Sequence, residues 1–202
     1  MVEARLIDTR AARFMTWFAL VFALATDAVY LLLVLGQGGE RPDVATVVFI
    51  ASYLIALAAL LAASLLRRWS AVVRLSLRAA AAGGLLVLGV LAIFSIGLPL
   101  LIAGAMATGA TVRTLRGPFL TVPSISAVAA AVVAVVVLVA GFEVTERMIA
   151  CPAHGSSGGG GTGLVTGPYY YDCVDGQLTF HSGSCNTAAS IDSNGIVTHP
   201  GC

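Results

Sequence analysis

The sequence contains an uncharged run of 34 residues, Ala79–Val112, whose length constrains the fold more than any other feature. A single α-helix of that length would measure about 51 Å, at a rise of about 1.5 Å per residue. The hydrocarbon core of a bilayer is about 30 Å thick, and helix tilt absorbs only part of the difference. The run is therefore either two short helices joined by a turn or one long kinked helix.

The stretch Ile96–Pro99 is the place where this run can turn. Gly97 relaxes the backbone, and Pro99 lacks an amide donor and disfavours helix in the residue before it. A turn here predicts two spans, over about 79–96 and 98–112. A single kinked helix is the alternative, because proline is tolerated inside membrane helices.

Three further apolar blocks cover about residues 14–36, 45–66 and 122–142. Apolar residues make up 58% of the chain and charged residues 10%, whereas soluble domains carry about 25% charged residues. We therefore predict an all-α integral membrane protein whose residues 1–148 form a bundle of five transmembrane helices, or four if Ala79–Val112 is one helix. The lipid bilayer is then the main environment of the chain. The net charge of +1 argues against a nucleic-acid partner.

The arginines predict how the chain is threaded. All eleven basic residues are arginine, which is typical of a high-GC bacterial genome. Five spans place nine arginines inside and two outside, whereas four spans place eight inside and three outside, so the positive-inside rule favours five. The expected location is the plasma membrane, with the N-terminus in the cytoplasm and the tail outside. The two outer arginines are Arg41 and Arg147; the nine inner ones are Arg5, Arg10, Arg13, Arg67, Arg68, Arg74, Arg78, Arg113 and Arg116.

The basic stretch Arg67–Arg78 separates the second span from the uncharged run. At helical spacing one face carries Arg67, Arg74 and Arg78, and another carries Trp69, Val72, Val73 and Ser76. That pattern predicts either a short helix lying in the membrane interface or a basic cytoplasmic loop.

The C-terminal part divides into a flexible Gly-rich linker, 149–168, and a Cys-rich tail, 169–202. Asp175-Gly176 and Asn194-Gly195 are hairpin-turn signals between short strand-like stretches. Tyr169–Tyr171 are expected to be core residues of this tail or an aromatic anchor at the lipid headgroups. A β-rich unit of this size needs disulfides or a metal to hold it together.

All four cysteines lie in the C-terminal quarter, and each histidine is separated from a cysteine by two or three intervening residues. An even number of cysteines in an exported tail favours disulfides, with three possible pairings. Cys–His spacings of this kind also suit a zinc or copper site, although no CxxC motif is present. The disulfide candidates are the four cysteines; the candidate metal ligands are Cys151, His154, Cys173, His181, Cys185, His199 and Cys202.

Asp27 is the one ionisable residue deep within a predicted span, with Tyr30 one turn away. A charge inside a bilayer costs several kcal/mol, so such a residue is a functional candidate. It would relay a proton or bind a cation. Alternatively, it faces the bundle and is protonated or hydrogen-bonded to Thr26 or to a hydroxyl of a neighbouring helix.

No P-loop, dinucleotide fingerprint, GxSxG or HExxH motif occurs in the chain, so we expect neither an enzyme nor a cofactor. The favoured function is an accessory or structural envelope component that acts through protein–protein contacts. Small-residue faces, such as Ala103 with Ala107, suit packing within the bundle, against a membrane-protein partner or in a homo-oligomer. The alternatives are a small transporter or channel component that uses Asp27, and a metal-binding or metal-sensing protein that uses the tail.

Overall fold

The computed structural model describes residues 10–36, 44–114, 121–145, 147–149, 151, 153–183, 190–191 and 197–198. The chain divides into two compact units. The first comprises residues 1–39 and 47–138, and the second comprises residues 40–46 and 139–202. Helix α5 contributes residues to both.

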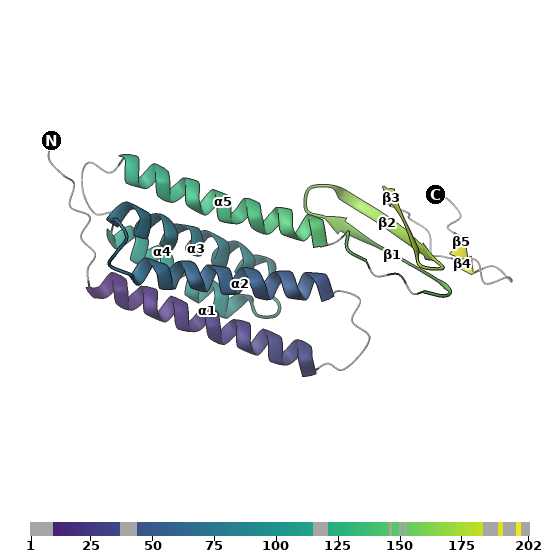
Figure 1. Cartoon of the computed structure of the whole chain (residues 1–202), viewed down its shortest axis with the longest axis horizontal. Helices are drawn as coiled ribbons and strands as arrows, with labels where there is room; N and C mark the ends of the chain where they lie inside the picture. Colours follow the sequence, from purple (N-terminus) through teal and green to yellow (C-terminus); the bar gives the residue numbers. More distant parts are fainter. Residues whose placement is uncertain are drawn as a thin grey trace. The chain divides into compact units, whose positions relative to one another are not determined.

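The first unit is a helical bundle (Figure 1). Among the described residues, four helices are long and apolar enough to cross a membrane, and α4 is shorter, at 18 residues. The prediction of a mostly helical protein with apolar helices of membrane-spanning length is confirmed. The helices are α1 (Arg10–Gly36), α2 (Val44–Leu65), α3 (Ala71–Leu91), α4 (Gly97–Thr114) and α5 (Thr121–Thr145).

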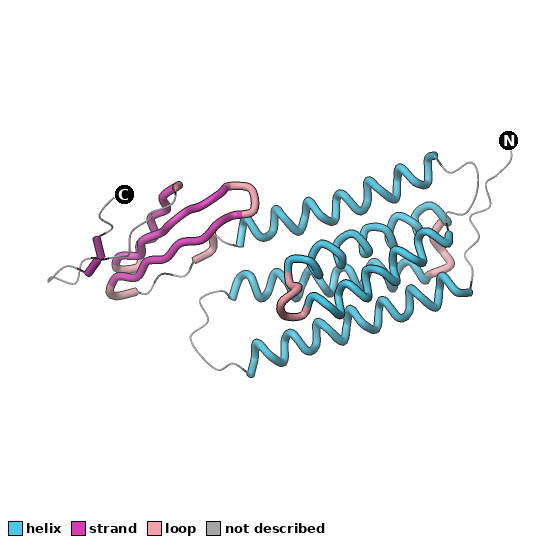
Figure 2. Tube along the Cα trace, turned by 180° about the vertical axis from the view of Figure 1, so that it is seen from behind, coloured by secondary structure: helices cyan, strands magenta, loops and turns pink. Residues whose placement is uncertain are grey.

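The long uncharged run is two helices, because α3 ends at Leu91 and α4 begins at Gly97 (Figure 2). The turn occupies residues 92–96, so the predicted turn at Ile96–Pro99 is placed a few residues too late. Pro99 instead lies in the first turn of α4. Its missing amide N–H costs nothing there, because the first amides of a helix have no intrahelical acceptor.

The turn depends on a close approach between two glycines. The Gly97 amide donates to the Ala92 carbonyl oxygen at 2.8 Å, which closes the turn. A Cβ at Gly97 would collide with the Gly89 carbonyl oxygen and with the carbonyl carbon of Ala92, the latter at 2.6 Å. Both are backbone atoms, so they have no freedom to move aside.

Helix α3 begins earlier than expected, at Ala71. Ser70 caps it, with its side-chain oxygen accepting a hydrogen bond from the Val73 amide at 3.4 Å. Arg74 and Arg78 therefore belong to the first two turns of this long helix. The predictions of a separate interfacial helix or a loop over Arg67–Arg78 are both wrong, because the bundle itself accommodates Arg78 between polar side chains.

Small residues let the helices of the bundle pack closely. Gly84 of α3 faces Tyr53 and Leu57 of α2, and Gly104 of α4 faces Leu86 of α3. The Tyr53 hydroxyl donates to the Ala134 carbonyl of α5 at 2.8 Å, which links α2 to α5. These two glycines therefore serve close packing between helices within the bundle.

The second unit carries two small sheets. One has three strands in the order β1-β2-β3 with antiparallel pairing, and the other pairs β4 with β5. The predicted hairpin is confirmed: Asp175 (φ 46°) and Gly176 (φ 79°) form the two-residue turn between β2 and β3. Asn194 and Gly195 lie outside the described residues. The strands are β1 (Ser156–Gly163), β2 (Gly167–Val174), β3 (Gln177–Ser182), β4 (Ser190–Ile191) and β5 (Val197–Thr198).

Strand β1 lies inside the segment expected to be a flexible linker, so that prediction is wrong. Gly159 is paired with Tyr171, and Gly161 with Tyr169. A Cβ at either glycine would lie 2.7 Å from the hydroxyl oxygen of its paired tyrosine, so the rings occupy the space above the glycines. Aromatic side chains thereby stabilise a strand that glycine alone would leave flexible.

We expect the substitution Gly97→Ala to destabilise the bundle by about 1–3 kcal/mol, the usual cost of overpacking against groups that cannot move. The matched control is Gly109→Ala in the same helix, where the added Cβ would lie 3.6 Å from the Met15 side chain, an ordinary contact. The control should keep or slightly raise stability, since alanine favours helix. Thermal unfolding in detergent micelles measures both, and equal melting temperatures for the two variants would contradict the role of Gly97.

Candidate functional site at the end of helix α5

A disulfide joins the start of the second unit to the middle of its sheet. Cys151, six residues after α5, is bonded to Cys173 of β2, whose side chain is buried. The Asp175 amide also donates to the Gly155 carbonyl oxygen at 3.1 Å. The sheet is therefore tethered covalently close to the end of α5, and the disulfide expected in the tail is present.

A carboxylate provides a second tether. Glu143, in the last turn of α5, accepts a hydrogen bond from the Val165 amide at 2.6 Å and one from the Thr166 hydroxyl at 2.8 Å. Val165 and Thr166 form the turn between β1 and β2. Both carboxylate oxygens are used, so a single side chain holds this turn against the helix end.

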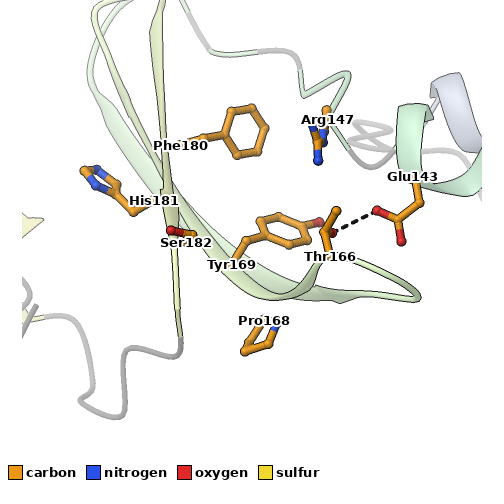
Figure 3. A pocket seen from close by; sticks show the side chains of 8 residues that line it. All are labelled: Glu143, Arg147, Thr166, Pro168, Tyr169, Phe180, His181 and Ser182. Carbon is orange, nitrogen blue, oxygen red and sulfur yellow. Dashed lines mark hydrogen bonds between the residues drawn. The ribbon is translucent and has the colours of Figure 1, made fainter.

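A cavity of about 330 Å³ lies between the end of α5 and the sheet. The Tyr169 and Phe180 rings project into it from β2 and β3, and the Arg147 side chain points into it from beyond the helix end (Figure 3). The two rings are tilted by 54° with their centroids 6.0 Å apart. The lining residues are Glu143, Arg147, Thr166, Pro168, Tyr169, Phe180, His181 and Ser182.

The opposite face of the sheet has a different arrangement. The His181 side chain points away from the cavity (Figure 3) and stacks on Tyr170, with ring centroids 4.5 Å apart and planes 8° from parallel. Its Nε2 atom lies 3.6 Å from Oδ2 of Asp172. His181 is therefore held by a ring and a carboxylate on its own face of the sheet.

The predicted metal ligands are not brought together in the part of the chain that the structure describes. Cys151 and Cys173 are bonded to each other, so they are not free thiolates, and His154 is exposed. No group of three His, Cys, Asp or Glu side chains suited to a metal ion occurs among the described residues. The remaining candidates, Cys185, His199 and Cys202, lie outside them.

Among the described residues of the helical bundle, one acidic and one basic side chain are buried. Asp27 is 6% exposed, and its Oδ1 atom has no hydrogen-bond partner among the described residues. Thr26 does not serve it, because the Thr26 hydroxyl donates to the Phe22 carbonyl at 2.8 Å. Arg78 is 1% exposed, with Nε 3.4 Å from the Ser64 hydroxyl and Nη1 3.4 Å from the Thr114 hydroxyl.

Sequence reasoning identified Asp27 and the cysteines but missed Glu143, Arg147 and Arg78 as site residues. Glu143 and Arg147 are four residues apart at the end of an apolar block, where charges normally just mark the end of a span. The signal for Arg78 is the pair of hydroxyl residues on other helices, which only the folded bundle brings to it. Comparisons of the chain with protein-family models, curated proteins and solved structures found no match.

The Glu143 tether makes a measurable prediction for the β1–β2 turn. In Glu143→Ala, the Val165 amide loses its acceptor, so its hydrogen exchange should speed up severalfold. Glu143→Gln keeps one carbonyl oxygen and should lie between the alanine variant and the unchanged protein. Hydrogen exchange followed by mass spectrometry tests this on the full chain. Unchanged exchange in the alanine variant would show that the tether does not hold the turn.

Proposed function

We propose that this protein is a non-enzymatic, multi-pass envelope protein of the plasma membrane whose disulfide-bonded β-unit is displayed outside the cell. The helical bundle anchors the chain, and the β-unit makes the contacts with ligands or with a membrane-protein partner. The observation that carries the proposal is the double tether of the sheet to α5, through Cys151–Cys173 and through Glu143. Two tethers make the β-unit a fixed recognition surface.

The proposal includes α4 as a fifth span. Gly104 of α4 lies against Leu86 of α3, and Thr114, the last residue of α4, lies beside Arg78 near the beginning of α3. The helix thus runs antiparallel to α3 over its whole length. Its residues Leu100, Ala103, Ala107 and Ala110 are completely buried. A length of about 27 Å is close to the thickness of the hydrocarbon core, which favours a crossing.

The chemistry of the β-unit supports the outer location. Disulfides persist in oxidising compartments and are rare in the cytoplasm. The arginine distribution with five spans puts the tail on that same outer side. Disulfide chemistry and arginine distribution are independent, and both favour a cytoplasmic N-terminus and an outer C-terminus.

A transporter or channel component is the second candidate, and one observation favours it. The Asp27 carboxyl group is buried in a helix of membrane-spanning length, and one of its oxygens lacks a hydrogen-bond partner among the residues described. A proton or a cation would satisfy that oxygen.

The threading is tested with epitope tags at the two ends of the chain. We expect protease added to intact spheroplasts to remove a C-terminal tag and to leave an N-terminal tag, because five spans put the ends on opposite sides. A cytoplasmic protein serves as the integrity control. Protection of both tags until lysis would mean an even number of spans and a cytoplasmic tail, and it would overturn the proposed function.

The Asp27 alternative is tested by proton flux. We expect liposomes holding the unchanged protein, liposomes holding Asp27→Asn and empty liposomes to dissipate an imposed pH gradient at equal rates, because the favoured function requires no transport. A pH-sensitive dye inside the liposomes reports the rate. Faster dissipation with the unchanged protein, abolished by Asp27→Asn, would replace the accessory function by proton transport.

A further inference from the structure

The cavity between α5 and the sheet is lined by two side chains of opposite charge. Arg147 points its guanidinium group into it, and Glu143 stands on the side of the β1–β2 turn (Figure 3). A guanidinium group presents a planar fork of donors that matches a phosphate group. The Glu143 oxygens accept hydrogen bonds from Val165 and Thr166, and carboxylate oxygens have further lone pairs for a cationic donor.

Aromatic side chains complete the end of the cavity that would bind a cation, near Glu143. The Tyr169 and Phe180 rings pack against each other with their centroids 6.0 Å apart, and both line the cavity, so a small group beside this pair meets aromatic surface from two strands. An ammonium group is attracted to aromatic faces and to a carboxylate at the same time. The cavity therefore suits a ligand with a phosphate group at Arg147 and an ammonium group near Tyr169 and Glu143.

The size and position of the cavity indicate where such a ligand comes from. Its volume of about 330 Å³ is at the lower end of small-molecule sites, which span about 300–1,000 Å³. Glu143 lies in the last turn of a helix long and apolar enough to cross a membrane, and Arg147 follows it. The end of such a helix lies at the depth of the lipid headgroups.

We propose that this cavity binds a phosphoethanolamine group, the zwitterionic headgroup of a membrane phospholipid. The primary ammonium group is specified because it donates hydrogen bonds to Glu143, which a quaternary ammonium group does not do. The inference rests on the proposed function, since it gives the displayed β-unit a ligand at the membrane surface. A soluble glycerophosphoethanolamine has the same chemistry and is the other source of the group.

The test is native mass spectrometry of the full chain in detergent micelles containing equal amounts of phosphatidylethanolamine, phosphatidylglycerol and phosphatidylcholine. We expect the phosphatidylethanolamine adduct to dominate. In Arg147→Gln this adduct should fall by about tenfold, the change that loss of one charge-assisted hydrogen bond produces. Phe180→Leu, which removes a ring and keeps an apolar side chain, should weaken it to a smaller extent.

The matched control is Arg67→Gln, which removes another exposed arginine, two residues after the end of α2 and in the other unit. This variant should keep the adduct. Equal adducts of the three lipids, an unchanged adduct in Arg147→Gln, or an equal loss in Arg67→Gln would each overturn the proposal. Unchanged melting temperatures in detergent micelles, together with retention of the Cys151–Cys173 bond, show that the variants are folded.

Added glycerophosphoethanolamine distinguishes the two sources of the ligand. If millimolar glycerophosphoethanolamine displaces the lipid adduct, the cavity binds the phosphoethanolamine group without the acyl chains. Failure to displace it would assign the site to the intact lipid at the membrane surface. The binding assay does not depend on which side the tail faces, so its failure and a failure of the threading experiment are separate results.

Discussion

The backbone contact between Gly89 and Gly97 decides how the rest of the chain is arranged. An uncharged run too long for one span must bend, and it bends where α3 and α4 approach so closely that no side chain fits between them. The resulting helical hairpin returns α4 along α3. In the proposed five-span threading, this hairpin puts every later residue on the opposite side of the membrane from where a single helix would leave it. In that threading, a steric contact some fifty residues before the disulfide sets the side of the membrane on which the tail folds.

The interior of the bundle shows how polar groups are tolerated among apolar helices. The hydroxyls of Thr16, Thr26, Thr111 and Thr114 each donate to the carbonyl four residues earlier in their own helix. Such bonds satisfy a hydroxyl without a partner helix. Arg78 cannot do this, and it instead lies near hydroxyls from α2 and α4 close to the ends of these helices. The Asp27 carboxyl group is different, because its Oδ1 atom has no hydrogen-bond partner among the described residues.

The fold was predictable from the sequence wherever one physical requirement dominated. Apolar length located the helices, and Asp175-Gly176 located the hairpin, because only a few residues adopt its positive φ angles. The prediction of a linker over 149–168 was wrong because it considered the flexibility of glycine alone. The register that sets Tyr169 and Tyr171 over Gly161 and Gly159 exists only after the strands pair. Glu143 and Arg147 were missed as site residues for the same reason, since Glu143 gains its role from the β1–β2 turn and Arg147 from the cavity beside the folded sheet.

The double tether changes what the tail is able to do. A Gly-rich segment ending in a small sheet would sample many positions, and a ligand would have to order it at an entropic cost. Because of the Cys151–Cys173 bond and the Glu143 hydrogen bonds, most of that ordering takes place when the chain folds and not when a ligand binds. They also place an arginine, a carboxylate and two aromatic rings around one cavity before any ligand arrives. Preorganisation of this kind is useful to a binding surface and unnecessary in a spacer, so the tethers support the recognition role proposed for the β-unit.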